Sequence, residues 1–297
     1  MTDESQLSVE VITVDKRPQI PAEVLGEKVT ESPTFREVFT LDVENVAADG
    51  SGTVKATFTE LELSGVSLVT KLLEGIEDIG EVSLEGGNFR MTLCQDGRVT
   101  TVTGMNALAD EVSEKQMKAM LKQAERLPRQ SRDEFESRIA QVKDALGTMA
   151  GALLGDDSTR ERMEGWLNIY PASPVRVGDT WNKTRATYNP FAPIVIADTW
   201  QLKESRDGVA TLERRADITP NNQAPPLEIL GLRVRMGFTG KVTGTVEVDE
   251  KTGWILLSTM TSDVRYERTI ERSGGGQVRF QARMRGITRV ETSKNPT

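Results

Sequence analysis

Carboxylates are the side chains that could do acid–base chemistry in this chain, because its 297 residues include no histidine and a single cysteine, Cys94. Adjacent carboxylates occur at Glu77-Asp78, Asp156-Asp157 and Asp249-Glu250. Each pair lies near a glycine in a stretch that predicts a turn or a helix cap, where Asp and Glu are expected for structural reasons. We therefore predict that the protein is not an enzyme and has no catalytic residue, with a carboxylate-dependent hydrolase as the remote alternative.

The composition lacks most of the side chains that usually bind metals and cofactors. Histidine is the commonest metal ligand and the commonest general base, and zinc, Ser-His and Cys-His sites need more His or Cys than the chain contains. We expect no bound metal and no cofactor. One cysteine cannot form an intrachain disulfide, which fits a reducing compartment or an envelope protein that does without such bridges.

The charge is unevenly distributed along the chain. The formal net charge is −8, with 16 Lys/Arg against 29 Asp/Glu in residues 1–159 and 21 against 16 in residues 160–297. The net values are therefore −13 and +5, and the two parts should present different electrostatic faces. An acidic chain of this kind is not expected to bind nucleic acid.

Methionine and aromatic residues recur on the faces that we expect to point inward. Because unbranched thioethers can repack around varied ligands, such residues predict a groove for a lipid or lipoprotein. The alternative is an ordinary core, since amphipathic spacing does not distinguish a filled core from a cavity. The candidate ligand-binding residues are Met91, Met117, Met120, Met149, Met236, Phe238, Met260, Phe280 and Met284.

Five arginines alternate with the inward-facing residues of two predicted strands and should form a basic ladder on the outer face. They suit a lipid headgroup or an acidic protein partner. The alternative is a solvated face with cross-strand partners such as Glu247 or Glu267. The candidate contact residues are Arg233, Arg235, Arg279, Arg283 and Arg285.

The elements that must position these residues are mostly strands. Apolar residues alternate with polar ones around Phe39 and Phe58, with a slip near Glu60 that predicts a bulge, and Asp96-Gly97 predicts a hairpin turn. Residues 1–34, interrupted by three prolines, predict an N-terminal arm or an edge strand. Further strands are expected at residues 194–204, 208–218, 232–249, 254–269 and 276–291.

The hydrophobic period changes to that of helices over residues 105–169. Three Ser-x-x-Glu/Gln sequences, beginning at Ser113, Ser131 and Ser158, predict capping boxes, and Gly155 lies where a C-terminal cap is expected. Each helix is apolar on one side, so it should lie against a sheet. Trp181, at the start of the returning strand, is expected to pack against the last helix.

The architecture that reconciles these patterns is α+β. We predict a curved antiparallel half-barrel sheet, with the helical segment of about residues 105–169 inserted between its halves and packed on its concave face. Residues 35–297 would then form a single domain. No apolar run reaches the ~18 residues of a transmembrane segment, and the acidic start lacks the features of a signal peptide. Either the protein stays in the cytoplasm, or this chain is a mature segment with a start Met added.

Residues 171–181 read P-A-S-P-V-R-V-G-D-T-W, following D-G-R-V-T-T-V-T-G at 96–104 and preceding G-T-V-E-V-D-E-K-T-G-W at 244–254. In this order the motifs resemble a poorly characterised family of exported bacterial proteins and lipoproteins, over roughly residues 35–269. That family looks like the half-barrel of the periplasmic lipoprotein carriers, whose cavity takes acyl chains. This chain departs from the family in lacking a visible signal peptide and a lipobox cysteine near its start.

Two functional hypotheses follow. The first is a non-enzymatic protein of the bacterial cell envelope or periplasm that binds a hydrophobic or amphipathic ligand, a lipid or lipoprotein, in a half-barrel groove. The second is a structural or interaction subunit whose core is filled by its own side chains and which acts through protein–protein contacts. Ligand identity, partner and oligomeric state do not follow from the sequence.

Overall fold

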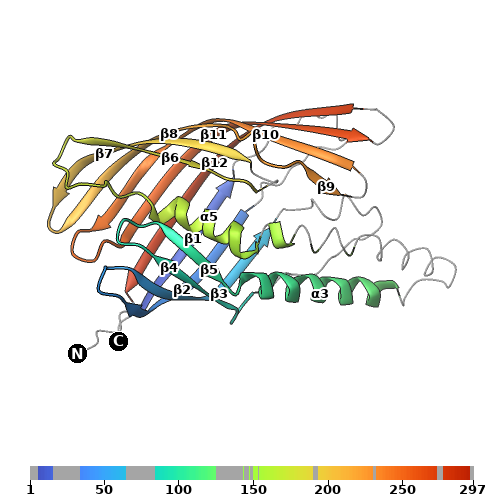
Figure 1. Ribbon diagram of the computed structural model, residues 1–297, viewed down its shortest axis with the longest axis horizontal. Coiled ribbons are helices and arrows are strands. Elements are labelled where there is room, and N and C mark those ends of the chain that lie inside the picture. Colours follow the sequence, from blue (N-terminus) through green and yellow to red (C-terminus); the bar gives the residue numbers. More distant parts are fainter. Residues whose placement is uncertain are drawn as a thin grey trace.

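A long, curved antiparallel sheet forms most of the computed structural model; one helix lies within its curve and a longer helix extends outward from it (Figure 1). The structure describes residues 6–15, 34–64, 84–124, 150–152, 154–189, 193–229, 232–272 and 277–294, together with residues 143 and 147. The predicted α+β class, a curved antiparallel sheet with a helical insert, is confirmed. The expected helix over residues 68–79 and the capping box at Ser131 lie outside the described residues.

The strands follow one another in the order β5-β4-β3-β2-β1-β12-β11-β10-β8-β7-β6, with β9 paired to β10 at the side. Two meanders of neighbouring strands are thus joined where β1 pairs with β12. The N-terminal meander comprises β1 (Gln6–Asp15), β2 (Thr34–Val46), β3 (Gly52–Ser64), β4 (Asn88–Leu93) and β5 (Val99–Thr103). The C-terminal meander comprises β6 (Thr180–Ala186), β7 (Ile194–Arg206), β8 (Val209–Pro220), β9 (Leu227–Ile229), β10 (Leu232–Asp249), β11 (Ile255–Arg272) and β12 (Gln277–Lys294).

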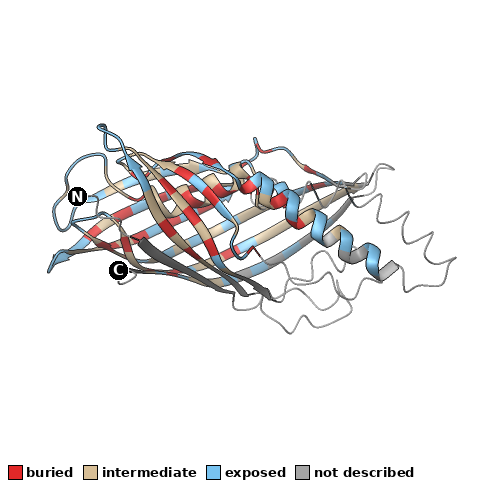
Figure 2. Cartoon of the chain, turned by 90° about the horizontal axis from the view of Figure 1, so that it is seen from below, coloured by how far each residue is buried: buried red, intermediate tan, exposed pale blue. Residues whose placement is uncertain are grey.

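Buried residues alternate with more exposed ones along the strands whose burial is described, which places one face of these strands inside the curve (Figure 2). In the N-terminal meander, Phe39, Phe58 and Phe89 are all almost fully buried and their rings are in contact. The predicted bulge is present, because the register of β2 against β3 shifts where Val38 pairs with Glu60 and Phe39 with Phe58. The extra residue changes the phase of β3, so that the strand positions of Leu61 and Leu63 share a face with that of Phe58.

The prediction for residues 1–34 needs a correction at β1. We expected an arm or an edge strand, but β1 pairs along one side with β2 and along the other with β12. Val11, for example, lies opposite both Glu37 and Val290. The prolines that suggested an edge, Pro18, Pro21 and Pro33, all follow the strand and so do not interrupt its hydrogen bonds.

The helices begin at residues other than those the capping boxes predicted. Helix α3 spans Met105–Ala124 and α5 spans Asp156–Leu167. Ser113 therefore lies inside α3, where its Oγ donates a hydrogen bond to the Ala109 carbonyl. Gly155 ends the helical run that includes residues 150–152 and 154, as predicted, because its N–H donates to the Gly151 carbonyl at 2.8 Å, and it is also the N-cap of α5. A Cβ on Gly155 would come 2.3 Å from the Gly151 oxygen, so the close packing where one helix ends and the next begins also favours glycine.

The two helix N-termini cap each other. The backbone N–H groups of Met105 and Asn106 donate to Oδ1 of Asp156, at 2.7 and 3.2 Å. In return, the Asp156 N–H donates to the Asn106 side-chain oxygen at 3.0 Å. Exposed N–H groups at the start of a helix need such acceptors, and a carboxylate there also interacts favourably with the helix dipole.

Helix α5 contacts both meanders from inside the curve. Met163 is buried in the core of the N-terminal meander, and Trp166 stacks on Phe39 with ring centroids 6.4 Å apart. Ile169, just beyond the helix, is buried in a second core cluster with Trp200 of the C-terminal meander. We call the face that packs against α5 and Ile169 the inner face. None of the helices in the described part of the chain is long and apolar enough to cross a membrane.

Candidate functional site

The predicted groove residues do not form one continuous lining. Met91 is buried in the core of the N-terminal meander, at 1% exposure. Met260 is buried, at 9% exposure, in the second cluster around Trp200. Met117 is half-buried on α3, and the side chains of Met120 and Met149 lie outside the described residues. Met91 and Met260 therefore have the environment of ordinary core residues.

The remaining predicted residues share the inner face of β10–β12. In the register, Met236 lies opposite Arg268 and Arg268 opposite Phe280. Phe238 lies opposite Tyr266, and its ring centroid is 5.1 Å from that of Tyr266. Met284 lies opposite Val264. The strand positions of Phe280 and Met284 are thus on the same face as Met236 and Phe238, although their side chains are outside the described part.

This part of the inner face is less completely covered than the two cores. A third apolar cluster contains the buried side chains of Ile196, Ile218 and Val264. Around it, Ile194, Phe238 and Val242 pack as half-buried residues. Large apolar side chains that point inward yet stay half-buried are the feature that a bound apolar group would cover.

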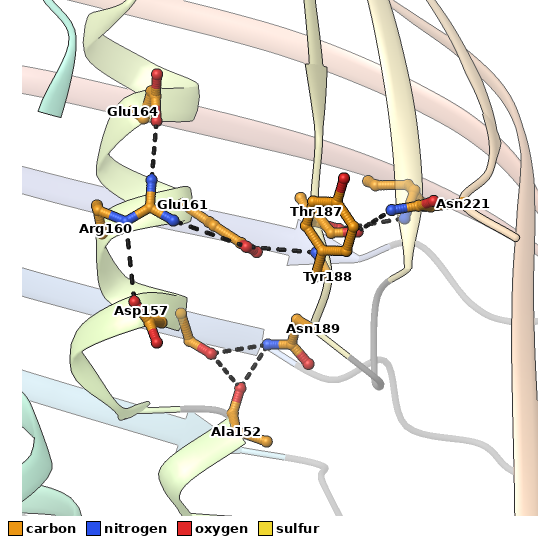
Figure 3. Close-up of polar contacts among 11 residues, drawn as sticks. Ala152, Asp157, Arg160, Glu161, Glu164, Thr187, Tyr188, Asn189 and Asn221 are labelled. Carbon is orange, nitrogen blue, oxygen red and sulfur yellow. Dashed lines mark hydrogen bonds and ion pairs between the residues drawn. The ribbon is translucent and has the colours of Figure 1, made fainter. Parts of the chain in front are cut away.

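A polar pocket lies next to this cluster, between α5 and the end of β6 (Figure 3). It has a volume of about 230 Å³. Three carboxylates surround the Arg160 guanidinium. Glu164 lies 3.3 Å from it, and Glu161 and Asp157 lie 4.0 Å from it. The pocket is lined by Arg160, Glu161, Glu164, Arg185, Ala186, Thr187 and Tyr188.

Hydrogen bonds between α5 and the segment after β6 hold the pocket together. The Glu161 carboxylate accepts from the Tyr188 backbone N–H at 3.3 Å. The Asn189 side-chain amide donates to Ser158 Oγ at 3.0 Å and also to the Ala152 carbonyl (Figure 3). Burial raises the pKa of Glu161 above its ordinary value, although the Tyr188 N–H and Arg160 act in the opposite direction.

A buried ion cluster is connected to the pocket through Arg185. Asp198 Oδ1 accepts two hydrogen bonds from Arg214, at 2.8 and 2.7 Å, and Asp198 Oδ2 lies 3.8 Å from Arg185 Nε. Asp198 and Arg214 are 5% and 8% exposed. The Arg214 guanidinium also lies 5.4 Å from the ring centroid of Trp200, a cation–π contact that favours a buried guanidinium.

Arg185 is the cation of this cluster that lines the pocket. Burial and the neighbouring Arg214 lower the pKa of Arg185, while Asp198 and Glu164 partly offset this. Gly165 permits the position, because a Cβ there would come 2.3 Å from a terminal nitrogen of Arg185. Asp198 accepts its two short hydrogen bonds from Arg214 and lies 3.8 Å from Arg185 Nε. The other N–H groups of Arg185 are therefore donors suited to a carboxylate or phosphate oxygen that enters the pocket.

The sequence contained a signal for this cluster that we did not use. Asp198 falls in the inward phase of β7, between Ile196 and Trp200, and Arg214 falls in the inward phase of β8, between Leu212 and Ala216. A charged residue at an inward position of a strand predicts a buried ion pair. Arg185 could not be found in this way, because strand β6 alternates only between half-buried and exposed positions.

The carboxylate pairs have structural roles where the structure describes them. Asp156 caps α3, and Asp249 accepts the backbone N–H groups of Lys251 and Thr252 at 2.9 Å in a turn. Glu250 accepts a hydrogen bond from Ser205 at 2.6 Å. Glu77 and Asp78 lie outside the described residues. Among the residues described, no group of three or more Cys, Asp and Glu side chains is placed to hold a metal ion.

The three sequence motifs meet around the end of α5. A Cβ on Gly97 would come 2.1 Å from the Leu167 carbonyl oxygen, so the Asp96-Gly97 turn lies directly against the helix end. The Tyr170 hydroxyl donates to the Gly253 carbonyl. Trp181 Nε1 donates to the Ile169 carbonyl at 2.8 Å. Turns from three distant parts of the chain therefore fix residues 167–170 against the sheet.

The basic ladder is on the outer face and exposed, as its alternation predicted. Arg279 forms an ion pair with Glu267 at 2.9 Å, one of the two partners expected. Arg283 and Arg285 both pair with Asp263, at 2.6 and 3.4 Å. Exposed pairs of this kind are consistent with a solvated sheet face and contribute little stability.

The fold and site define an antiparallel-sheet protein whose inner face carries apolar clusters beside a small polar pocket. The chain belongs to the Family of unknown function (DUF6263), which it matches over residues 82–255. No curated protein matches the chain. The matched stretch includes the three motifs, α3, α5 and the residues that line the pocket. The pocket therefore lies within the part of the chain that matches the family.

Among solved structures, the chain is similar to one titled "Lipid-protein interactions in lipovitellin", with a TM-score of 0.40 and 7% identity. The match covers 99% of this chain and 25% of that chain. At this TM-score the likeness does not establish a common fold. The resemblance to the lipoprotein carriers therefore stays a prediction from the motifs.

Proposed function

We propose that the protein is a non-enzymatic binding protein for an amphipathic ligand. The polar group of the ligand occupies the pocket between α5 and β6, and the apolar part lies along the inner face of β10–β12. The observation that carries this proposal is a single register row, which starts at Arg185 in the pocket and continues through Ile196, Ile218, Gly240 and Val264. One end of the row offers hydrogen-bond donors, and the rest is an apolar cluster with the half-buried Phe238 and Val242 beside it.

The size of the pocket favours a ligand that extends beyond it. A volume of about 230 Å³ is below the ~300–1,000 Å³ typical of pockets that enclose a small molecule. The pocket can therefore hold the polar group of a ligand but cannot enclose a whole small molecule. The half-buried Phe238 and Met236, on the neighbouring part of the inner face, provide the apolar surface that the rest of the ligand would cover.

The same proposal includes a non-enzymatic role and a location in the cell envelope or periplasm. Asp198 is held by two arginines, and Glu161 is held by a backbone N–H, so both carboxylates are engaged as structural acceptors. The cell envelope or periplasm is supported by the resemblance of residues 171–181 to exported proteins. Of the possible ligands, a lipid or the acyl part of a lipoprotein best combines a polar head with a long apolar chain.

A second candidate function is that of a structural or interaction subunit with a self-filled core. The burial of Met91 and Met260 favours it, because these two predicted groove residues pack as core. On this alternative, Met236 and Phe238 would be covered by the protein itself and no ligand would be needed.

Native mass spectrometry of protein purified without detergent tests the proposal. We expect a copurifying amphiphile, and saturable binding of the fluorescent fatty acid cis-parinaric acid by stripped protein. Phe238→Asp should weaken that binding at least tenfold, because it places a charge on the apolar inner face. Thr239→Asp, one residue along on the exposed outer face, is the matched control and should change binding less than twofold.

Arg185→Gln separates the two parts of the site. It should weaken binding of the fatty acid more than binding of the corresponding fatty alcohol, since the alcohol lacks the carboxylate that the guanidinium would contact. If the protein carries no amphiphile and binds neither probe saturably, the self-filled alternative is correct.

A further inference from the structure

The outer face of β10–β12 carries more positive charge than the basic ladder alone. The register places Lys241 and Arg265 on the same face, since Lys241 lies opposite Asp263 and Arg265 lies opposite Thr239 and Arg283. Both side chains are exposed. With the five ladder arginines this makes seven cations. Along the same stretch these strands carry three carboxylates, Asp263, Glu267 and Glu271. Two more lie on the adjoining strands, Asp217 opposite Lys241 and Glu228 opposite Arg233, which leaves an excess of two positive charges.

Among the described residues, the ion pairs leave most of these cations without a bonded carboxylate. Three of the seven cations, Arg279, Arg283 and Arg285, pair with Glu267 or Asp263. The other four, Arg233, Arg235, Lys241 and Arg265, form no ion pair with a carboxylate in the part of the chain that the structure describes. Arg233 lies opposite Glu271 and Glu228 in the register, and Lys241 lies opposite Asp263 and Asp217, without such a pair. Their charge is therefore available to a partner.

We propose that this outer face binds the surface of a membrane that contains anionic phospholipids. Six of the seven cations are arginines, and a guanidinium can donate two parallel hydrogen bonds to a phosphate group. The cations are spread over three neighbouring strands, so they form a two-dimensional array that matches a layer of headgroups. Basic residues near an anionic leaflet each add to binding, and the effect decreases within a Debye length.

A membrane surface fits this face better than an acidic protein does. Protein interfaces are anchored by buried apolar or aromatic residues at their centre. Between the cations, the outer face carries Gly237, Thr239, Thr269 and Gln281 instead. A phosphate layer needs no apolar anchor, so the polar character of the face is no obstacle to membrane binding.

The charge distribution also fixes the orientation. Residues 1–159 have a net charge of −13, so an anionic surface repels that part of the chain. The outer face of β10–β12 therefore turns toward the membrane. The same strands carry Met236 and Phe238 on their opposite face, which brings the proposed ligand region within one sheet thickness of the bilayer. The membrane proposal does not depend on that ligand region.

Vesicle cosedimentation of the full chain tests this inference. We expect the protein to sediment with vesicles of 30% phosphatidylglycerol in phosphatidylcholine at low salt, to be released at 0.5 M salt, and to stay in solution with pure phosphatidylcholine. The triple variant Arg235→Gln, Lys241→Gln, Arg265→Gln should lower the partition coefficient at least tenfold. These side chains are exposed and have no described ion-pair partner, so the fold should be retained, which circular dichroism checks.

The matched control removes the same charge elsewhere. Lys115, Lys118 and Lys122 are exposed on α3, and their triple substitution by Gln should change the partition coefficient less than twofold. Equal losses in the two triple variants would mean that net charge alone governs binding, and would overturn the assignment to this face. Failure of the parent protein to prefer the anionic vesicles at low salt would also overturn it, and an acidic protein would become the better partner.

Discussion

At the scale of single residues, two tryptophans on neighbouring strands have different roles. We expected Trp181 to pack against the last helix, at Trp166 or Leu167. Instead it is half-buried, and its indole N–H bonds to the Ile169 carbonyl just beyond α5, while Trp166 packs on Phe39 of the other meander. Trp200, opposite Trp181 in the register, is 2% exposed and lies under the Arg214 guanidinium. Trp200 is therefore the deeper anchor.

Truncating the two tryptophans should show this difference. Trp200→Ala should destabilise the protein by about 3–5 kcal/mol, because it leaves a large cavity in a closed core and uncovers the Asp198–Arg214 pair. Trp181→Ala should cost less, since the side chain is already half-exposed. Urea unfolding of both variants beside the parent gives the comparison. A lower midpoint for Trp181→Ala than for Trp200→Ala would show that the hydrogen bond to Ile169 outweighs burial.

Residue patterns predicted the strands better than they predicted the site. The expected strand at 232–249 matches β10, and the other four expected strands agree with theirs to within three residues at each end, because long alternation between apolar and polar residues is a local property. The pocket depends on Arg185 meeting Gly165 of α5, a contact between distant segments. Ser113 misled the prediction because a Ser-x-x-Gln sequence also fits inside a helix, where Ser113 bonds to the preceding turn.

At the scale of elements, α5 is positioned by turns. Asp96-Gly97, Gly178-Asp179 and Thr252-Gly253 all lie near its C-terminal end or the segment that follows it, and each of these glycines has a positive φ. In the second turn, Asp179 Oδ2 accepts the Arg176 N–H at 2.8 Å, and the Gly178 N–H donates to Leu202 of β7. The turns of the three sequence motifs thus help to fix the helical insert to the sheet.

Two glycines with the same backbone conformation provide a test of this role. Gly97 and Gly208 have φ values of +81° and +79°, but a Cβ on Gly208 meets nothing within 4 Å, whereas one on Gly97 meets the Leu167 carbonyl. Gly208→Ala should cost about 1–2 kcal/mol, the penalty of the left-handed conformation. Gly97→Ala should cost clearly more, because the end of α5 must also move. Equal unfolding midpoints would mean that the turn does not constrain the helix.

At the scale of the whole molecule, the pairing of β1 with β12 joins the two meanders into one sheet. Nine residue pairs connect these strands, from Leu7 opposite Lys294 to Asp15 opposite Gly286. Helix α5 adds a second connection, because residues at its end contribute to the cores of both meanders. We therefore propose that both meanders unfold as a single domain, as the sequence led us to expect.

A proline in β1 tests this coupling. Val11→Pro removes a main-chain donor from a strand that is paired on both sides, and should cost about 3 kcal/mol or more. Val11→Ala, which keeps the N–H group, is the control at the same position and should cost less. Tryptophan fluorescence, which includes the signal of Trp200 on β7, should report the loss in one urea transition. A Trp200 signal that unfolds at the parent midpoint in Val11→Pro would show that the meanders are independent.

The seam between β1 and β12 also constrains how the chain can be made. Strands β1 to β5 leave the ribosome first and can pair with one another, but the free edge of β1 has no partner until residues 277–294 have been synthesised. An unpaired strand edge recruits other chains, and pairings between segments so distant in sequence form slowly. The last strand is therefore the step that completes the sheet, and a nascent chain arrested before residue 277 should be the form of this protein most prone to aggregation.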